Sequence, residues 1–187
     1  LNELNLARRS IEADMQDTAN LVLEEIDVAG RYSLSLYNPQ WHQGVIGILA
    51  SRIKERYHRP VIAFAQAGNG QDAEPQLKGS GRSISGLHLR DALDLVAKRQ
   101  PGLIVRFGGH AMAAGLTIRE SDLEFFTREF EAVVGGLLTP ADLESVIEVD
   151  GALATSDTNW SVACAIEQQV WGKGFPLPAF CDEFVVL

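Results

Sequence analysis

The sequence predicts an α/β protein, with a layered sheet-and-helix domain followed by a smaller module of a different kind. Strand-like and helix-like segments alternate from Tyr32 to Val134, which is the pattern of an α/β layered domain. After Leu138 this alternation stops. The composition is that of an ordinary globular protein, with 46% hydrophobic and 22% charged residues among 187. This length suits one full domain plus part of a second, and we place the boundary near residue 139.

Four helices are expected in the first part of the chain. Residues 1–26 contain good helix formers and neither Gly nor Pro. Residues 44–57 and 88–99 carry apolar side chains at helical spacing, so that each would bury one face. Ser121-x-x-Glu124 reads as a capping box, and a fourth helix should begin there and continue to a pair of glycines.

Five strands are expected between these helices, because short runs of β-branched, aromatic and other apolar residues are bounded by turn signals. They are residues 32–37, 60–64, 77–84, 103–107 and 116–118. Gly108-Gly109-His110 should form a tight loop, followed by one helical turn at 111–114.

The segment after Leu138 has its own pattern. Thr139–Asp142 should form a short turn, residues 145–149 a strand and residues 158–170 a helix. An aromatic loop rich in Pro and Gly follows at 171–180. These elements predict the beginning of a second module.

Charge is distributed unevenly along the chain. The net charge of −9 argues at first against a nucleic-acid partner. However, residues 31–118 carry a net +6, between flanks of −5 (residues 1–30) and −10 (residues 119–187). An anionic ligand senses the local charge within a Debye length of about 10 Å. Solvated helix faces without a partner would give the same distribution, so charge alone leaves both interpretations open.

Cysteine usage and the absence of sorting signals bear on location. Cys164 and Cys181 are too few for a disulfide framework, and we expect free, buried or half-buried thiols in a reducing compartment. No apolar run reaches the roughly 18 residues of a membrane span, and the first residues do not show the basic-then-apolar pattern of a secretory signal. We therefore expect a soluble, cytoplasmic protein. The chain starts without Met and stops inside an apolar run, so we expect it to be a piece of a longer protein.

The first candidate site is Gly79-Ser80-Gly81-Arg82. A Ser hydroxyl and an Arg two residues apart on a strand point the same way, so together they can hold a phosphate. The neighbouring glycines would bring bare N–H groups close to that anion. The alternative is a strand edge with an exposed Arg.

Two further candidates contain histidine. Gly108-Gly109-His110 could attract a phosphate to its turn, and His110 could bond a phosphoryl oxygen or assist proton transfer. In Trp41-His42-Gln43-Gly44, Trp41 could stack on a base and His42 could face an anion. A glycine turn with a structural histidine, and core packing with helix capping, are the respective alternatives. His58 and His88 are expected to be structural or solvated.

No metal site is expected. The four histidines show no His-x-x-x-His spacing, and the acidic residues lie mostly on the two flanks. The residues alone therefore predict an α/β domain with a central basic surface suited to phosphate.

Three stretches together resemble a known family. In order and spacing, residues 41–52, 78–83 and 108–115 resemble the DHH-associated domain of the RecJ family of single-stranded-DNA-specific 5′→3′ exonucleases, within the DHH phosphoesterase superfamily. Residues 171–180 resemble the segment that opens this family's OB-fold, although Trp171 and Phe175 stand where Phe and Asn are more common.

The resemblance implies three parts and a set of roles. Residues 1–30 would end a connector helix, 31–138 would form the DHH-associated substrate-binding domain, and 139–187 would be a partial OB-fold segment. Ser80 and Arg82 would hold the 5′-terminal phosphate of single-stranded DNA. Gly108, Gly109 and His110 would line the cleft facing the scissile phosphate, with His110 as an auxiliary catalytic group, and His42 would lie near the same cleft.

The resemblance also concerns metal and activity. Mn or Mg would be bound by Asp and His of an N-terminal DHH domain in the full-length enzyme, acting in DNA repair and recombination. No Asp-His-His occurs in this chain, so we expect it to bind no metal and to be inactive alone. The resemblance does not determine the oligomeric state.

Two alternatives remain at this point. The chain could belong to another phosphoesterase of the superfamily, acting on short oligoribonucleotides or cyclic dinucleotides, or it could be a non-catalytic nucleic-acid-binding domain. The smaller phosphoesterases usually carry a third glycine before the His, where this chain has Phe107, and they end soon after this domain. These two differences favour the nuclease.

Overall fold

The computed structural model describes residues 13–19, 28–68, 74–172 and 175–182. The chain divides into two compact units, Leu1–Glu144 and Ser145–Leu187, each of which is described by itself. None of the described helices is both long and apolar enough to span a bilayer.

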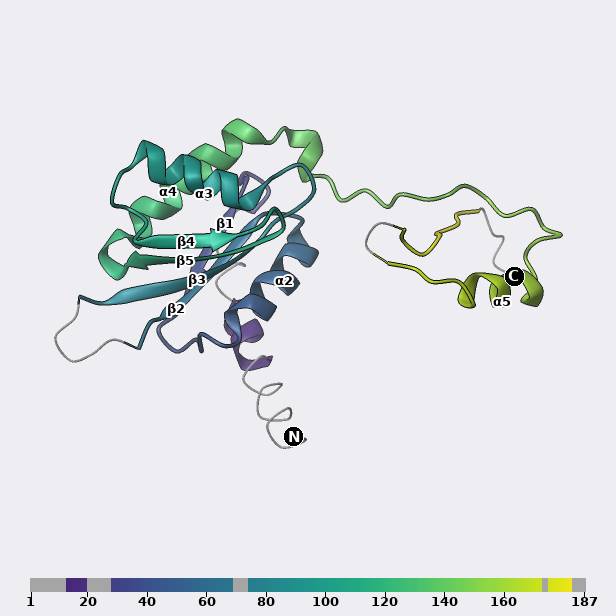
Figure 1. Cartoon of the computed structure of the whole chain (residues 1–187), viewed down its shortest axis with the longest axis horizontal. Helices are drawn as coiled ribbons and strands as arrows, with labels where there is room; N and C mark the ends of the chain where they lie inside the picture. The colour runs from purple at the N-terminus through teal and green to yellow at the C-terminus, as the bar shows by residue number, and fades with distance from the viewer. Residues whose placement is uncertain (1–12, 20–27, 69–73, 173–174, 183–187) are drawn as a thin grey trace. The chain divides into compact units, whose positions relative to one another are not determined.

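The first unit is built on one five-stranded sheet (Figure 1). In spatial order the strands are β1 (Leu34–Tyr37), β2 (Val61–Gln66), β3 (Gln76–Arg82), β5 (Ala113–Arg119) and β4 (Arg106–Gly109). β1 and β2 are parallel, whereas the three other pairs are antiparallel. β3 is therefore a central strand, paired on both of its sides.

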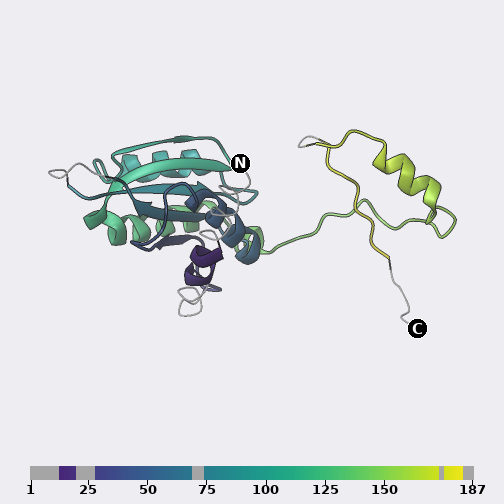
Figure 2. The same ribbon diagram turned by 90° about the horizontal axis from the view of Figure 1, so that it is seen from below.

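Helices cover both faces of this sheet (Figures 1 and 2). α2 (Ile46–Tyr57) connects β1 to β2 and packs on one face, against β2 and β3. α3 (Leu89–Arg99) and α4 (Leu123–Leu137) lie together on the other face. The α/β layered class predicted from the sequence is confirmed.

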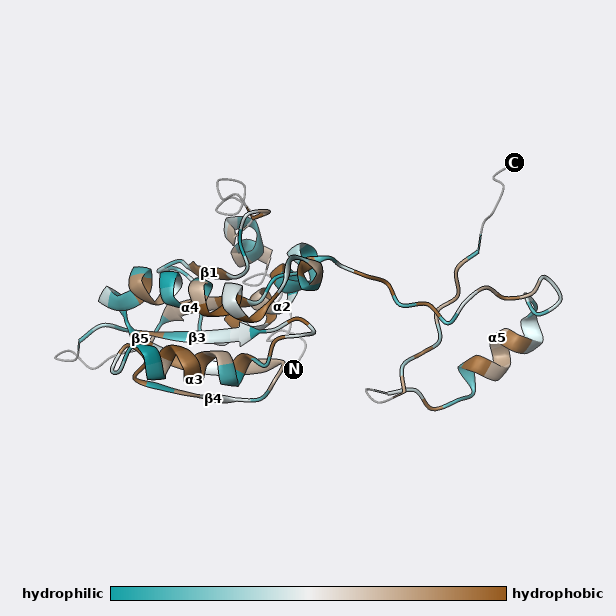
Figure 3. Cartoon of the chain, turned by 90° about the horizontal axis from the view of Figure 1, so that it is seen from above, coloured by the Kyte–Doolittle hydropathy of each residue, from teal (hydrophilic) through white to brown (hydrophobic). Residues whose placement is uncertain are grey.

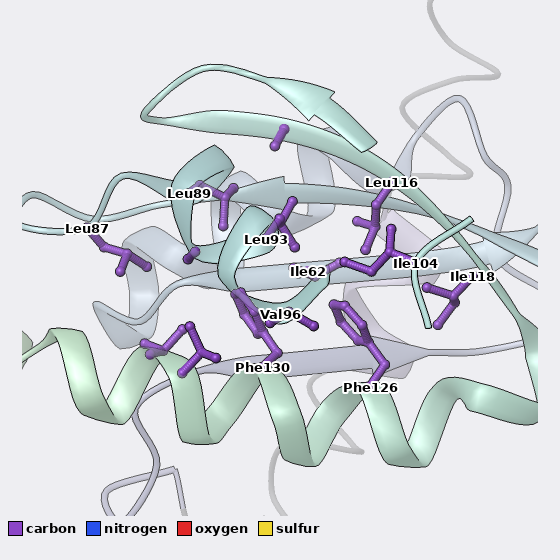
Figure 4. Packing of buried hydrophobic residues seen from close by; sticks show 14 of the residues in the cluster. Ile62, Leu87, Leu89, Leu93, Val96, Ile104, Leu116, Ile118, Phe126 and Phe130 are labelled. Carbon is purple, nitrogen blue, oxygen red and sulfur yellow. The ribbon is translucent and has the colours of Figure 1, made fainter. Parts of the chain in front are cut away.

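Two apolar cores result from the period-two alternation of buried strand residues. On β2, Val61, Ala63 and Ala65 face the α2 side, whereas Ile62 and Phe64 face α3 and α4. Figure 4 shows Phe126 and Phe130 of α4 directed into the core between the sheet and the helices α3 and α4. Phe64 and Phe126 meet edge to face with ring centroids 5.5 Å apart, an arrangement that stabilises aromatic pairs beyond their burial.

Several local predictions need correction. Gly108 and Gly109 belong to β4 rather than to a loop, and residues 111–114 form no helical turn, because they close the β4–β5 hairpin and begin β5. Ser121 does not cap α4. It lies in the 3₁₀ helix η1 (Glu120–Asp122), and Asp122 precedes α4 without a capping side-chain bond. The predicted helix at 1–26 lies outside the described residues except for 13–19, which are helical.

A capping box does occur, at the end of the first unit. In the 3₁₀ helix η2 (Pro140–Leu143), the side chains of Thr139 and Asp142 each bond the backbone N–H of the other. The Arg59 guanidinium donates to the Leu143 carbonyl at 2.8 Å, which attaches η2 to the end of α2.

The second unit contains one described helix, α5 (Trp160–Glu167), which is shorter than the predicted 158–170. No strand forms at 145–149, so that prediction is wrong. Short backbone bonds join 150–151 to 179–181, and the Trp171 ring stacks on Phe175 at 5.1 Å. α5 is largely apolar (Figure 3), yet none of its residues is buried. Both cysteines are free as expected, but Cys181 is exposed.

Candidate nucleic-acid interface

Ser80 and Arg82 lie on the same face of β3, as their spacing predicts. Ser80 is paired with Ala63 of β2, whose side chain belongs to the core under α2. Residues directly opposite one another in a sheet share a face. Ser80 and Arg82 therefore point toward the α2 side, and both are partly exposed there.

The Arg82 guanidinium is held by two hydroxyls. Its Nη1 donates to Ser80 Oγ at 3.2 Å and to the Gly81 carbonyl at 2.8 Å, while its Nε donates to Ser51 Oγ at 3.1 Å. Ser51 itself donates from α2 to the Gly47 carbonyl at 3.1 Å. Among the described residues Ser80 Oγ accepts this bond and donates none, so that its hydroxyl hydrogen can be offered to an anion.

Gly47 allows α2 to approach this pair closely. A Cβ on Gly47 would lie 2.9 Å from Arg82 Nη2 and 3.0 Å from Ser80 Oγ. Any larger residue would therefore displace the two polar groups from their positions. The helix, Ser80 and Arg82 together form one fitted unit.

Gly79 and Gly81 have a different role from the one predicted. A Cβ on Gly79 would lie 2.6 Å from both Leu116 Cδ2 and Phe64 Cε1, on the opposite face of the sheet. β3 is paired on both sides, so its backbone N–H groups belong to the sheet ladders and do not reach toward an anion. The glycines are required by core packing, and the alternative of a strand edge with an exposed Arg is excluded, because β3 is paired on both sides.

Gly108, Gly109 and His110 lie at the outer edge of the sheet. Gly108 is opposite Gly115 and Gly109 is opposite Ala114, while the His110 N–H donates to the Ala113 carbonyl at 2.8 Å. Gly109 has φ +148° and no room for a Cβ, since Ala113 O would be 2.5 Å away. His110 is exposed at the hairpin turn.

The Trp41–Gly44 segment is divided between core and surface. Trp41 is 5% exposed within the α2-side core, so it does not stack on a base and that prediction is wrong. His42 is exposed, and its Nδ1 accepts from the Gly44 N–H at 3.1 Å. It lines a cavity of about 550 Å³ with Gln66, Gln76 and Glu120. In the described part of the chain no hydrogen bond joins His42 to Ser80 or Arg82.

The sheet face that carries Ser80 and Arg82, which we call the β3 face, is cationic. Across the described ranges, Lys78, Arg82 and Arg106 form no ion pair with a carboxylate. By contrast, Glu120 at the His42 cavity accepts from the Tyr37 hydroxyl at 2.7 Å. Burial, together with this bond to Glu120, raises the pKa of Tyr37 above its ordinary value. The two regions therefore differ in charge, and the β3 face is the one suited to an anion.

The site residues do not fit a divalent cation. Over residues 13–19, 28–68, 74–172 and 175–182, no three His, Cys, Asp or Glu side chains come together as metal ligands do. Mg²⁺ and Mn²⁺ prefer carboxylate, carbonyl and water oxygens, whereas the Ser80–Arg82 surface presents a guanidinium and hydroxyls. The chemistry available here is the binding and orientation of phosphate.

Sequence reasoning missed several members of this surface. Gly47 and Ser51 lie within the 41–52 stretch of the family resemblance, but no role was predicted for either, although their spacing of four places them on one face of α2. Arg106, Gly115 and Thr117 lie on the same sheet face as Ser80 through strand pairing. The period-two alternation would have identified these three once the pairing was known.

Relatives of this chain are found among DNA exonucleases. A family model of the DHHA1 domain matches residues 28–136. Over its full length the chain is 49% identical to the single-stranded-DNA-specific exonuclease RecJ of Dickeya dadantii (strain 3937) and 45% identical to that of Escherichia coli (strain K12). It spans 32% of the length of each of these relatives.

Solved structures agree in fold. The crystal structure of RecJ in complex with Mg²⁺ from Thermus thermophilus has a TM-score of 0.74 at 28% identity, covering 96% of this chain and 26% of that one. A crystal structure of exonuclease RecJ bound to manganese has a TM-score of 0.61 at 30% identity, covering 77% of this chain and 33% of that one. Together with the family match over residues 28–136, these likenesses show that the chain belongs to the DHHA1 domain family.

Proposed function

We propose that this chain is the substrate-binding part of a RecJ-type exonuclease, which degrades single-stranded DNA from its 5′ end during DNA repair and recombination in the cytoplasm. Residues 31–138 would bind the substrate, and 139–187 would begin an OB-fold that continues beyond the segment. The identity to RecJ exonucleases over the full length of the chain supports this assignment.

The observation that carries the proposal is the fitted Ser80–Arg82 pair. Arg82 is oriented by Ser51 and Ser80, and the Ser80 hydrogen remains available. A terminal phosphate could accept from the Arg82 guanidinium and from Ser80 at once, which gives charge-assisted bonds of defined direction. Such a site distinguishes a 5′-phosphate from a 5′-hydroxyl.

The remaining predicted residues are assigned to the adjacent part of the cleft. Gly108 and Gly109 would face the scissile phosphate, His110 would bond a phosphoryl oxygen or assist proton transfer, and His42 would lie near the entrance. Mn²⁺ or Mg²⁺ would supply the activated water of phosphodiester hydrolysis and would be bound by the N-terminal domain of the full-length enzyme.

The first test uses the isolated chain. Because its described residues form no cluster of metal ligands, we expect no Mn²⁺-dependent release of nucleotides from single-stranded DNA. The measurement is release of acid-soluble label by the pure chain, with the full-length protein as the positive control. Reproducible release that scales with the concentration of the chain would overturn this expectation.

The second test concerns Arg82 in the full-length protein. Arg82→Ala should lower kcat/KM on 5′-phosphorylated DNA by roughly 10- to 100-fold, because about 1.4 kcal/mol corresponds to a factor of ten and a charge-assisted bond contributes about 1.5–3 kcal/mol. Arg82→Lys should recover only part of this loss, since an ammonium lacks the planar set of donors that lets the guanidinium bond Ser51, Ser80 and a phosphate at the same time.

The control is the same DNA with a 5′-hydroxyl. Without a terminal phosphate, the ratio of mutant to wild-type kcat/KM should be much closer to one. Equal ratios on the two substrates would mean that Arg82 supplies general attraction or fold stability, and that the assignment of a 5′-phosphate site is wrong.

A further inference from the structure

The hairpin turn between β4 and β5 carries His110 at the surface of the first unit. In the described sheet β4 is the edge strand next to β5, and both His110 and Met112 are exposed. Within the turn, the His110 N–H donates to the Ala113 carbonyl at 2.8 Å. An exposed turn on an edge strand opens easily, so it needs further contacts to hold a side chain at a fixed place.

These contacts come from residues 83–89, which we call the docking loop. The Ser83 N–H donates to the Met112 carbonyl at 3.0 Å, and the Leu89 N–H donates to the Ala111 carbonyl at 2.8 Å. Leu89 is the first residue of α3, and N–H groups at the start of a helix lack partners within the helix. The hairpin turn is thus bonded at the two successive carbonyls that follow His110.

The docking loop is closed by the side chain of Ser83. The Ser83 hydroxyl donates to the Leu87 carbonyl at 2.8 Å, and Ser83 is only 1% exposed. Gly86, with φ +89°, lets the chain turn back between these two residues. Leu87 and Leu89 are buried in the core beside α3 and α4 (Figure 4). Because a buried carbonyl needs a donor, the hydroxyl fixes the direction of the Leu87 peptide and, through it, that of the Leu89 N–H.

Ser83 also lies between the two halves of the candidate site. It follows Arg82 in the chain, and Arg82 is paired with Ala113 of β5. Since Ala113 in turn accepts from His110, the Cα atoms of Arg82 and His110 lie about two strand spacings apart, roughly 10 Å. A displacement of about 1 Å in such an arrangement can lower a rate about 100-fold.

We propose that Ser83 is a positioning residue for His110. The inference rests on the proposed function, because it concerns the role assigned there to His110. The Ser83 hydroxyl would close the docking loop, and the loop would hold the hairpin turn so that His110 meets the scissile phosphate while Arg82 holds the terminal one. Ser83 itself would touch neither phosphate, because its hydroxyl is buried and bonded to Leu87.

The first measurement is of kcat and KM for the full-length protein with Mn²⁺ on single-stranded DNA. Ser83→Ala should lower kcat about tenfold and leave KM within about a factor of two, because the DNA is still bound but the group that acts at the scissile phosphate is displaced. Ser83→Cys keeps nearly the volume of serine and a weak donor, so it should lose less activity.

The matched control is Ser33→Ala. Ser33 is 4% exposed and its hydroxyl donates to the Glu131 carboxylate, but it precedes β1 at the opposite edge of the sheet. This substitution should lower the melting temperature as Ser83→Ala does, and it should leave kcat unchanged. An equal loss of kcat in the two variants would mean that Ser83 acts only through the stability of the unit, which would overturn the inference.

Hydrogen exchange of the full-length protein gives a readout that does not depend on activity. In Ser83→Ala the amides of residues 84–89 and 109–113 should exchange faster, because the bonds between the docking loop and the hairpin turn open more often. The amides of β1 and β2 should keep their protection. Unchanged exchange in both segments would show that the hydroxyl does not hold the turn, and the inference would be wrong.

A double-mutant cycle with His110→Ala separates this inference from the proposed function. If Ser83 acts through His110, Ser83→Ala should cause no further loss of kcat in the His110→Ala protein. If Ser83→Ala slows the His110→Ala protein as much as it slows the wild type, the positioning role is wrong and the role of His110 stands. If His110→Ala alone leaves kcat unchanged, the role assigned to His110 fails, and the positioning role of Ser83 fails with it.

Discussion

Glycine has three different roles within a few residues of the candidate site. Gly47 and Gly79 lack a side chain because another group occupies the space, Arg82 in one case and the core in the other. Gly109 combines lack of space with a positive φ. Gly108 and Gly115 have neither constraint. Sequence alone cannot separate these roles, since each depends on what lies opposite.

A stability measurement separates glycines whose missing side chain is required by packing from glycines where a Cβ would fit. Gly79→Ala should lower the free energy of unfolding by about 1–3 kcal/mol or more, because the added methyl would overlap Leu116 and Phe64 in a closely packed core. Urea unfolding of the isolated chain, followed by Trp fluorescence, gives the value.

The matched control is Gly136→Ala. Gly136 lies in α4, and a Cβ there meets nothing within 4 Å. Replacing glycine by alanine in a helix should raise the free energy of unfolding by about 0.5–1 kcal/mol. Equal effects of the two substitutions would refute the packing explanation for Gly79.

The Ser80–Arg82 pair was predictable from the sequence, because strand alternation alone puts both side chains on one face. The groups that orient Arg82 were not. Ser51 precedes it by 31 residues, and the 3.1 Å contact depends on how α2 lies against β3. Likewise, the burial of Trp41 depends on helix packing rather than on its neighbours in the chain.

At the scale of elements, α4 is joined to the start of β1 by one carboxylate. The Glu131 carboxylate accepts from the backbone N–H groups of Tyr32 and Ser33, each at 2.8 Å, and also from the Ser33 hydroxyl. Ser33 is only 4% exposed, so these donors have little access to water as a replacement.

Removing that carboxylate should therefore be costly. Glu131→Ala should reduce the free energy of unfolding by about 1–3 kcal/mol, the cost of leaving buried donors unsatisfied. Glu124→Ala is the control, because its i,i+4 pair with Arg128 is exposed and contributes less than about 0.5 kcal/mol. Thermal or urea unfolding of both variants tests this, and a Glu131→Ala protein as stable as the control would contradict it.

The capping box of η2 gives a pH-dependent prediction. Bonds from the Thr139 hydroxyl and backbone N–H lower the pKa of Asp142 below its ordinary value. A carboxylate with a lowered folded-state pKa contributes stability above its unfolded pKa, and this contribution is lost as the pH falls through the folded value.

An NMR titration of the Asp142 side chain should thus give a midpoint below that of an unstructured peptide. Thr139→Ala should move the midpoint back toward the ordinary value, because it removes the hydroxyl donor. If the Asp142 midpoint is the same in the wild-type and Thr139→Ala proteins, the Thr139–Asp142 hydrogen bond does not form in solution.

The order and type of the elements in the first unit were predictable, whereas several of their ends were not. Apolar spacing, turn signals and composition predicted α2, α3, α4 and the five strands between Tyr32 and Val134, whereas η1 was not predicted and the helical turn expected at 111–114 does not form. The ends of β4 and β5 depend on pairing with each other: Gly108 and Gly109 are in a strand because Gly115 and Ala114 lie opposite. Likewise, Ser121-x-x-Glu124 matches a cap in sequence, but η1 takes its place.

For the whole molecule, the two units should differ strongly in local stability. In the first, large side chains such as Phe64, Phe126 and Phe130 are fully buried, whereas α5 in the second contains no buried residue. Large apolar side chains of the second unit, including Val146, Ile147 and Trp160, are exposed. Local unfolding of a segment should require little free energy where that segment loses few apolar contacts.

Native-state hydrogen exchange tests this difference. Amides of α5 should exchange with much lower protection than those of β2 and β3 in a monomeric sample. Equal protection of the two sets would show that the second unit has a core of its own. The predicted strand at 145–149 failed for the same reason, because a strand needs a partner that its own sequence does not specify.

The position of Ser80 and Arg82 on the central strand has a thermodynamic consequence. Their backbone is fixed on both sides by ladders, and Arg82 is already bonded to Ser51 and Ser80 before any ligand arrives. The conformational entropy of ordering a long cationic side chain is therefore lost during folding and not during association. A phosphate would meet a preorganised receptor, so binding should proceed with little change in the structure of β3.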